Sequence, residues 1–209
     1  MAKTKTAYFC QSCGTQFSKW LGQCTSCHQW NTIVEEIIQK ESKREWAINS
    51  SVKKIAKPQR ISEIELSEQD RISTKSEELN RVLGGGLVKG SVVLVGGEPG
   101  VGKSTLLLQI AMLLNHKILY VSGEESLTQI KMRSERLKEF NPNCYILTET
   151  NTQNIFRSIE TLQPEILIID SIQTLYTDYL DATPRTVSQI RQSAPAPINF
   201  AKETSTPIF

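Results

Sequence analysis

The sequence lacks any apolar run of the roughly eighteen or more residues that a membrane-spanning helix needs. No hydrophobic signal region follows its basic first residues, MAKTKT. An excess of charge of one sign is also missing, since the net charge is +2 at pH 7 and does not by itself indicate a nucleic-acid-binding protein. We therefore expect a cytoplasmic protein with no membrane partner.

The composition is otherwise typical of a globular protein. The 209 residues are 39% apolar and 22% charged, and they suffice for one domain plus a small appendage. Positive charge is concentrated in two places: residues 1–30 contain three lysines and no acidic residue, and residues 43–60 contain six basic residues and Glu45. These stretches could contact phosphate backbones, or they could be solvated linker.

Four of the five cysteines form two C-x-x-C pairs, Cys10 with Cys13 and Cys24 with Cys27, separated by ten residues. This spacing is typical of a zinc ribbon, in which four thiolates surround a tetrahedral Zn²⁺ and leave no open position for catalysis. The metal would supply the folding free energy that a segment of about thirty residues cannot obtain from a hydrophobic core. Disulfides are the alternative, and a reducing compartment disfavours them.

Residues next to the cysteine pairs complete the expected ribbon. We expect Phe9, Trp20 and Trp30 to form a small apolar cluster. Gly14 follows the first pair at a place that often needs a positive φ, and His28 takes the matching place after the second pair. A fifth-ligand role for His28 is the alternative.

Residues 97–104, GEPGVGKS, carry the phosphate-loop pattern G-x-x-x-x-G-K-S. An expected strand precedes them, residues 91–96, and a leucine-rich stretch, residues 105–115, follows them as an expected buried helix. Lys103 can reach the β- and γ-phosphates, and the Ser104 hydroxyl can bind Mg²⁺. The strand and helix context disfavours the alternative, a glycine-rich turn that binds nothing. The expected nucleotide-binding residues are Gly97, Glu98, Pro99, Gly100, Val101, Gly102, Lys103, Ser104 and Thr105.

Strand and helix patterns alternate after the loop. We expect strands over residues 117–122, 144–147 and 165–170, and helices over residues 126–140 and 152–162. This alternation indicates right-handed crossovers and a mainly parallel sheet covered on both faces, an α/β fold. Ligands of such folds bind at the carboxyl ends of the strands.

Three shorter stretches have their own patterns. Residues 33–38 suggest a short strand or an amphipathic piece that closes the ribbon, and residues 77–83 have helical spacing that ends at three glycines, residues 84–86. Cys144 stands alone in an apolar strand, where we expect it to be a buried small hydrophobe.

Acidic residues end two of the expected strands. Residues 165–170, EILIID, end in Asp170, as in a Walker B element, and this carboxylate would hold Mg²⁺ beside Ser104. A helix-capping role is its alternative. Residues 120–125, YVSGEE, end in two adjacent acids, of which one could deprotonate the attacking water. We expect Glu124 to be this base, although Glu125 could take the role instead of beginning the next helix.

Together these features resemble the RadA (Sms) family of bacterial DNA repair proteins. The resemblance covers almost the whole chain and rests on CQSCG at residues 10–14, KWLG at 19–22, the second cysteine pair, WNT at 30–32, RVLGGGL at 81–87 and the phosphate loop. It implies a zinc ribbon before a RecA-like ATPase core, with ATP, Mg²⁺ and Zn²⁺ as cofactors and Lys103 and Glu124 as catalytic residues. It further implies a DNA-dependent ATPase for branch migration in recombinational repair. Its implied partners are single-stranded DNA, recombination intermediates and a recombinase, and its implied assembly is a homo-hexameric ring.

The sequence departs from that family in three places. Residues 206–209 begin a further core strand, whereas RadA proteins continue with the rest of the ATPase core and another domain. Pro195 and Pro197 lie in an expected helix over residues 186–202, which should break there because proline removes a donor and clashes with the preceding turn. Lys75 stands in a surface turn where the family usually has glycine.

The expected organisation is a zinc ribbon over residues 1–34, a linker over residues 35–72 and an ATPase core, cut short at its C-terminal side, over residues 73–209. We expect this chain alone to be weak or inactive in hydrolysis. One alternative is a non-catalytic module in which the ribbon binds DNA or a partner while the core holds nucleotide. Another is a RecA-like regulatory kinase of the circadian-clock type, which shares the Glu–Glu pair but does not begin with a four-cysteine ribbon.

Overall fold

The computed structural model describes residues 5–38, 58, 60–63, 71–177, 180–181 and 187–209. Most of the expected linker, with the basic residues between 43 and 57, lies outside these residues. No helix of the described part is long and apolar enough to cross a membrane.

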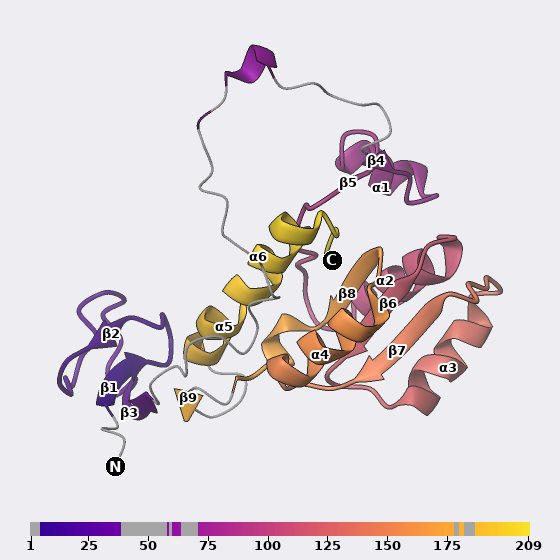
Figure 1. Ribbon diagram of the computed structural model, residues 1–209. Helices are drawn as coiled ribbons and strands as arrows, with labels where there is room; N and C mark the ends of the chain where they lie inside the picture. The colour runs from indigo at the N-terminus through magenta and orange to yellow at the C-terminus, as the bar shows by residue number, and fades with distance from the viewer. Residues whose placement is uncertain (1–4, 39–57, 59, 64–70, 178–179, 182–186) are drawn as a thin grey trace.

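The N-terminal residues form a small antiparallel sheet (Figure 1). Its strands are β1 (Lys5–Cys10), β2 (Gln16–Phe17) and β3 (Ile33–Ile38), and β1 lies between the other two. The register between β1 and β3 runs from Lys5 opposite Ile38 to Cys10 opposite Ile33. The expected short strand over residues 33–38 is therefore confirmed. A segment far along the chain, β9 (Leu180–Asp181), pairs with the free edge of β3.

The interior of this ribbon differs from the expected one. Its buried residues are Cys10, Cys24 and Ile33, and the partly buried side chains packed on them are Tyr8, Cys13, Phe17, Leu21 and Cys27. The predicted cluster of Phe9, Trp20 and Trp30 is wrong, because the side chains of Trp20 and Trp30 are 56% and 68% exposed. Strand alternation explains part of the difference: Tyr8 and Cys10 lie on one face of β1, and Phe9 lies on the other.

A short entry unit precedes the ATPase core. It consists of the 3-10 turn η1 (Ile61–Glu63), β4 (Arg71–Ile72), α1 (Glu77–Val82) and β5 (Leu87–Val88), and β4 pairs antiparallel with β5. The Ser76 side chain caps α1, and the glycines after Leu83 end it, as expected. Gly86 has a φ of 134°, and a Cβ there would lie 2.7 Å from the Ile72 carbonyl oxygen, so this close approach requires glycine.

The central sheet contains three parallel strands, β6 (Ile118–Ser122), β7 (Cys144–Thr148) and β8 (Ile166–Asp170), in the order β7-β6-β8. Residues 207–209 extend it: the Leu167 N–H donates to the Pro207 carbonyl, and the Phe209 N–H donates to the Leu167 carbonyl. Residues 91–93 lie on their other side, since the Val93 N–H donates to the Ile208 carbonyl at 2.8 Å. The expected strand over residues 91–96 is thus reduced to a single bridge, between Val92 and Ile208.

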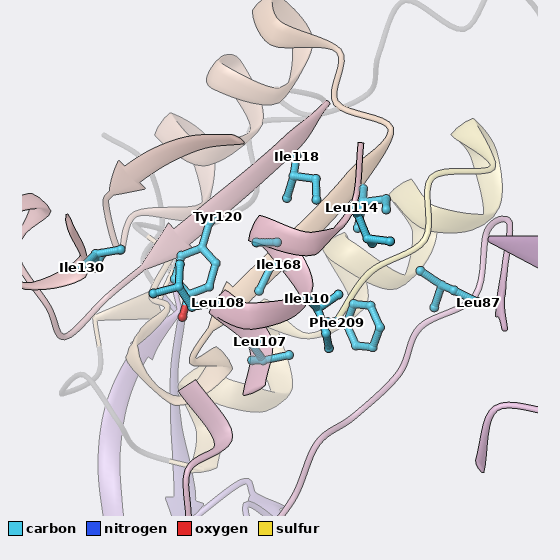
Figure 2. Close-up of a cluster of buried hydrophobic side chains, with 12 residues drawn as sticks. Leu87, Leu107, Leu108, Ile110, Leu114, Ile118, Tyr120, Ile130, Ile168 and Phe209 are labelled. Carbon is cyan, nitrogen blue, oxygen red and sulfur yellow. The ribbon is translucent and has the colours of Figure 1, made fainter. Parts of the chain in front are cut away.

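Helices cover both faces of this sheet, as the alternating pattern predicted. On one face α2 (Lys103–Leu113) and α3 (Leu127–Arg136) pack against alternate residues of β6 and β8 (Figure 2). On the other face α4 (Thr152–Leu162) packs against the intervening residues, including Leu119 and Leu167. Most of the apolar residues of α2 are buried, in agreement with the prediction of a buried helix: Leu107, Leu108, Ile110 and Ala111.

The helix expected over residues 126–140 ends four residues early, at Arg136. Lys138 has a φ of 59°, which is incompatible with a continuing helix. The buried Asn141 side chain then donates to the carbonyl oxygens of Ala111 and His116, at 3.0 Å each. These two bonds fix the chain against the end of α2.

The prolines divide the last helix as predicted. After the 3-10 turn η3 (Ile172–Thr174), the chain forms α5 (Val187–Ser193) and then α6 (Pro195–Thr204), on which Phe200 packs against Phe156. Pro195 occupies the first position of α6, where its missing N–H is not needed for the helix. Two prolines that would destabilise the interior of one helix are accommodated in the first turn of another.

Candidate functional site

Four cysteine sulfurs come together in the ribbon. The Sγ atoms of Cys10, Cys13, Cys24 and Cys27 all lie within 4.8 Å of one another. Those of Cys10 and Cys27 are 3.6 Å apart, as are those of Cys13 and Cys24. A tetrahedral zinc ion with Zn–S bonds of about 2.3 Å needs sulfurs about 3.8 Å apart, so the four side chains fit this metal. All four are free cysteines, which does not agree with the disulfide alternative.

Matching backbone turns hold the two cysteine pairs. The Gly14 N–H donates to the Cys10 carbonyl at 2.7 Å, and the His28 N–H donates to the Cys24 carbonyl at 2.8 Å. Gly14 has a φ of 68° and His28 a φ of 57°, so the expected positive φ is confirmed at both places. His28 contributes to its turn through the backbone, and in the described part of the chain the metal-binding group contains the four cysteines without it.

The surroundings of one cysteine favour its ionised form. The Thr15 hydroxyl lies 3.1 Å from the Cys13 sulfur, and this contact together with the Thr15 backbone lowers the pKa of the Cys13 thiol to about 6. Thiolates are the form that binds zinc. Cys144, far from this group, is half-buried instead of fully buried, and burial raises the pKa of its thiol to about 12.

The phosphate loop is an exposed turn that leads into α2. Gly100 and Gly102 have φ values of 81° and 102°, which other residues rarely adopt. Gly102 is the N-cap of α2 and has no side chain to cap the first N–H groups, so these groups can bind an anion. Lys103 donates from Nζ to the carbonyl oxygens of Gly97 and Glu98, at 2.8 Å each. Its ammonium group is thereby held against the loop.

Asp170 ends β8 and is held by the neighbouring strand. The Tyr120 hydroxyl donates to Asp170 Oδ2 at 2.7 Å. Burial, with the adjacent Asp170 carboxylate as a second cause, raises the pKa of Tyr120, so this hydroxyl stays protonated and remains the donor at neutral pH. Because the strands are parallel, Asp170 and the phosphate loop lie at the same edge of the sheet.

The two acids after β6 have different surroundings. Glu125 is half-buried and forms an ion pair with Arg133 of α3, whereas Glu124 is exposed. The Glu125 N–H also donates to the Ser122 hydroxyl at 3.1 Å. Glu125 therefore has a structural partner on the next helix, and Glu124 is the acid that faces solvent.

A tight backbone contact positions Glu124. The Gly123 N–H donates to the Asp170 carbonyl at 3.0 Å, which ties the residue before Glu124 to the end of β8. A Cβ on Gly123 would lie 1.9 Å from Thr174 Oγ1 and 3.0 Å from Thr150 Cγ2. Thr174 is buried, and its hydroxyl donates to the Ser171 carbonyl at 2.7 Å. The site thus needs glycine at position 123.

Sequence reasoning missed two residues of this site, Tyr120 and Arg133. A tyrosine inside a buried strand needs a hydrogen-bond partner for its hydroxyl, so the sequence could have predicted that Tyr120 bonds to a nearby polar group. Nothing in the sequence pairs Arg133 with Glu125, eight residues away, because that contact depends on how α3 leaves β6. The structure brings Glu124 and Asp170 to neighbouring strand ends, and it places residues 97–104 beyond residues 207–209 on the same edge.

Two family models match the chain. The rubredoxin metal-binding domain matches residues 8–35, and the ATPase family associated with various cellular activities (AAA) matches residues 93–194. The first range contains the four-sulfur group, and the second contains the phosphate loop, Glu124 and Asp170. The fold and the sites therefore define a P-loop ATPase domain that follows a zinc-ribbon domain.

Curated relatives narrow this class. The chain is 46% identical over 213 residues to the DNA repair protein RadA of Bacillus subtilis (strain 168), covering 100% of this chain and 46% of that protein. It is 43% identical to the RadA proteins of Pseudomonas aeruginosa and Aquifex aeolicus, again over 100% of this chain and 46% of each relative. The chain thus corresponds to the N-terminal portion of the RadA family of DNA repair proteins, and it spans slightly less than half the length of these relatives.

Proposed function

We propose that this chain is the N-terminal portion of a DNA-dependent ATPase that acts in recombinational repair and branch migration. The observation that carries the proposal is the shared sheet edge: Asp170 ends β8, Glu124 follows the adjacent β6 by two residues, and the phosphate loop follows residues 91–93, across residues 207–209. The zinc ribbon on the same chain and the names of the relatives support a role in DNA repair.

Residues 97–105 bind the triphosphate of ATP in this proposal. Their backbone N–H groups and the N-terminus of α2 attract the phosphates, and Lys103 exchanges its two carbonyl partners for β- and γ-phosphate oxygens. The ammonium group begins within the loop, so a change of side-chain rotamer suffices for the exchange.

Ser104 and Asp170 would hold Mg²⁺, which neutralises charge on the phosphate oxygens when it is bound. The Tyr120 hydroxyl keeps the Asp170 carboxylate in one orientation. Glu124 orients the attacking water and accepts its proton, since its side chain is exposed and the preceding Gly123 is hydrogen-bonded to the Asp170 carbonyl. Cys10, Cys13, Cys24 and Cys27 bind a structural Zn²⁺ that stabilises the ribbon.

The chain alone is weak or inactive in hydrolysis, and exposed apolar residues in the segment before the phosphate loop support this part of the proposal. Leu94 and Val92 lead into the phosphate loop and are 83% and 44% exposed. A loop whose preceding segment bonds to Ile208 through one bridge is held less firmly than one inside a complete sheet. The homo-hexameric ring and the recombinase partner belong to the same proposal and rest on the family resemblance.

Phosphate release from Mg-ATP tests the proposal, measured with and without single-stranded DNA and beside a Lys103→Ala variant. Weak release that needs both DNA and Lys103 is the expected result. A DNA-stimulated rate equal to that of ordinary ring ATPases contradicts the claim of weak activity. Release that ignores both DNA and Lys103 contradicts the proposed function.

The exposed tryptophans of the ribbon favour a second candidate, a binding module that hydrolyses nothing. In that case the chain binds DNA without regard to nucleotide, and the binding survives Lys103→Ala. The phosphate-release assay together with a DNA-binding measurement separates the two functions.

A further inference from the structure

Two tryptophans stand out on the surface of the ribbon. Trp20 is 56% exposed and Trp30 is 68% exposed, although tryptophan is among the most costly side chains to leave in water. The ribbon does not need them for its interior, which is built from Tyr8, Phe17, Leu21 and the metal-binding group. Exposed aromatic rings that take no part in the interior indicate an interaction surface.

Both rings lie against the same residue. A Cβ placed on Gly22 would be 3.7 Å from Trp20 Cη2 and 3.8 Å from Trp30 Cζ3, so the two six-membered rings flank Gly22. The two side chains therefore form one aromatic surface, which we call the tryptophan platform.

The backbone and one hydrogen bond hold the tryptophan platform in place. Trp20 donates from Nε1 to the Ile33 carbonyl at 3.1 Å. Trp30 forms a backbone bridge with Gln23, and the next N–H, of Asn31, donates to the Gly22 carbonyl at 2.9 Å. These contacts join the platform to the start of β3 and to residues 22–23, which directly precede Cys24. A ligand would therefore meet rings that are already positioned.

The charge around the platform suits an anionic ligand. The exposed Lys19 directly precedes Trp20, and residues 1–34 contain three lysines and no carboxylate. The carboxylates of the ribbon, the exposed Glu35 and the buried Glu36, lie on β3. The negative charge of a zinc–thiolate group lies partly inside the ribbon, since Cys10 and Cys24 are fully buried. Exposed amide side chains, Gln29 and Asn31, lie next to Trp30 in the chain. Nucleobases, with apolar faces, polar edges and an anionic backbone, match this combination.

We propose that Trp20 and Trp30 form a stacking platform for the unpaired bases of single-stranded DNA, with Lys19 beside the phosphate backbone. The inference rests on the proposed function, because that function makes single-stranded DNA the partner. Stacking on aromatic rings tolerates any base, so the platform binds without sequence preference. It gives the ribbon a task in DNA binding that is separate from the nucleotide site.

The experiment measures the Kd of the zinc-loaded chain for a labelled oligothymidylate of about thirty nucleotides, by fluorescence anisotropy. Trp20→Ala and Trp30→Ala are each expected to raise the Kd about tenfold, the lower part of the range for loss of one base–aromatic stack. Trp30→Phe, which keeps an aromatic face, should recover most of the affinity. Phe140→Ala is the matched control and should not change the Kd. Phe140 is an aromatic residue outside the ribbon, and its side chain is 78% exposed.

An oligonucleotide of the same length without bases separates stacking from charge. The wild-type chain should prefer the base-containing strand, and the two tryptophan variants should lose that preference while retaining stoichiometric zinc. An unchanged Kd in zinc-loaded Trp30→Ala contradicts the proposed platform. That result does not affect the proposed function, which is tested separately by Lys103-dependent phosphate release. A wild-type chain that binds no single-stranded DNA overturns the platform and the DNA dependence together. A protein partner as the true ligand would appear as full DNA affinity in both tryptophan variants.

Discussion

Replacing Gly123 by alanine tests how the site is held together. The new Cβ would lie 1.9 Å from Thr174 Oγ1 and 2.5 Å from Thr174 Cβ, both far inside van der Waals contact. Thr174 cannot simply turn away, because it is buried and its hydroxyl donates to the Ser171 carbonyl. Relief requires a shift of backbone at Gly123, at η3, or at both.

Overpacking of this kind costs about 1–3 kcal/mol in the free energy of unfolding. For a chain of this length the cost corresponds to a decrease in Tm of about 2–12 °C. Gly96→Ala is the matched control: a Cβ at Gly96 meets nothing within 4 Å, so the same substitution there should be close to neutral or stabilise by about 0.5 kcal/mol.

Thermal unfolding of the zinc-loaded variants, followed by far-UV circular dichroism, gives the comparison. Gly123→Ala combined with Thr174→Gly should recover part of the lost stability, because the second change removes the two closest atoms. Equal Tm values for Gly123→Ala and Gly96→Ala would show that the close contact between Gly123 and η3 does not exist.

Three further changes probe other contacts. Tyr120→Phe removes the hydroxyl that donates to the Asp170 carboxylate, which should lower the free energy of unfolding by about 1.5–3 kcal/mol. It should also weaken Mg-ATP binding measured by calorimetry. Unchanged values would contradict the hydrogen bond. Lys75→Gly should stabilise the chain by about 1 kcal/mol in urea unfolding, because Lys75 has a φ of 62°. The hydrogen bond from the Lys117 N–H lowers the pKa of the Glu165 carboxyl below its ordinary value of 4.5. The ionised carboxylate therefore contributes to the free energy of unfolding above pH 4.5, and this contribution is lost as the pH falls below that value. Glu165→Gln should abolish this part of the pH dependence.

Local patterns predicted most of the core. The alternating strands and helices after residue 117 follow from hydrophobic periodicity, and the break at Pro195 follows from the missing N–H of proline. The early end of α3 was not predictable in this way. It depends on a buried Asn141 side chain that bonds to carbonyls 25 and 30 residues earlier, and periodicity carries no information about such contacts.

The site shows the same division between local and distant information. The cysteine spacing and the phosphate-loop pattern are local, and the structure gathers those groups as the spacing suggested. Tyr120 and Asp170 are 50 residues apart and meet because of the register between β6 and β8. The prediction that Trp20 and Trp30 belong to the interior of the ribbon was wrong for a related reason. In a small ribbon a metal site supplies stability that would otherwise need a large apolar interior, so the aromatic residues are available for other contacts.

The distance between Asp170 and the phosphate loop depends on residues 207–209. They separate β8, which ends in Asp170, from residues 91–93, which lead to the phosphate loop, and they hydrogen-bond to both. The Ile208 carbonyl accepts from the Val93 N–H, the Ile208 N–H donates to the Ser91 carbonyl, and the Ile208 side chain is buried. On the other side the Phe209 N–H donates to the Leu167 carbonyl, and the Phe209 carbonyl accepts from the Ile169 N–H. Within the described residues, one intervening strand segment therefore sets the spacing of the phosphate loop from Asp170, and any element that holds that segment more firmly would also hold this spacing.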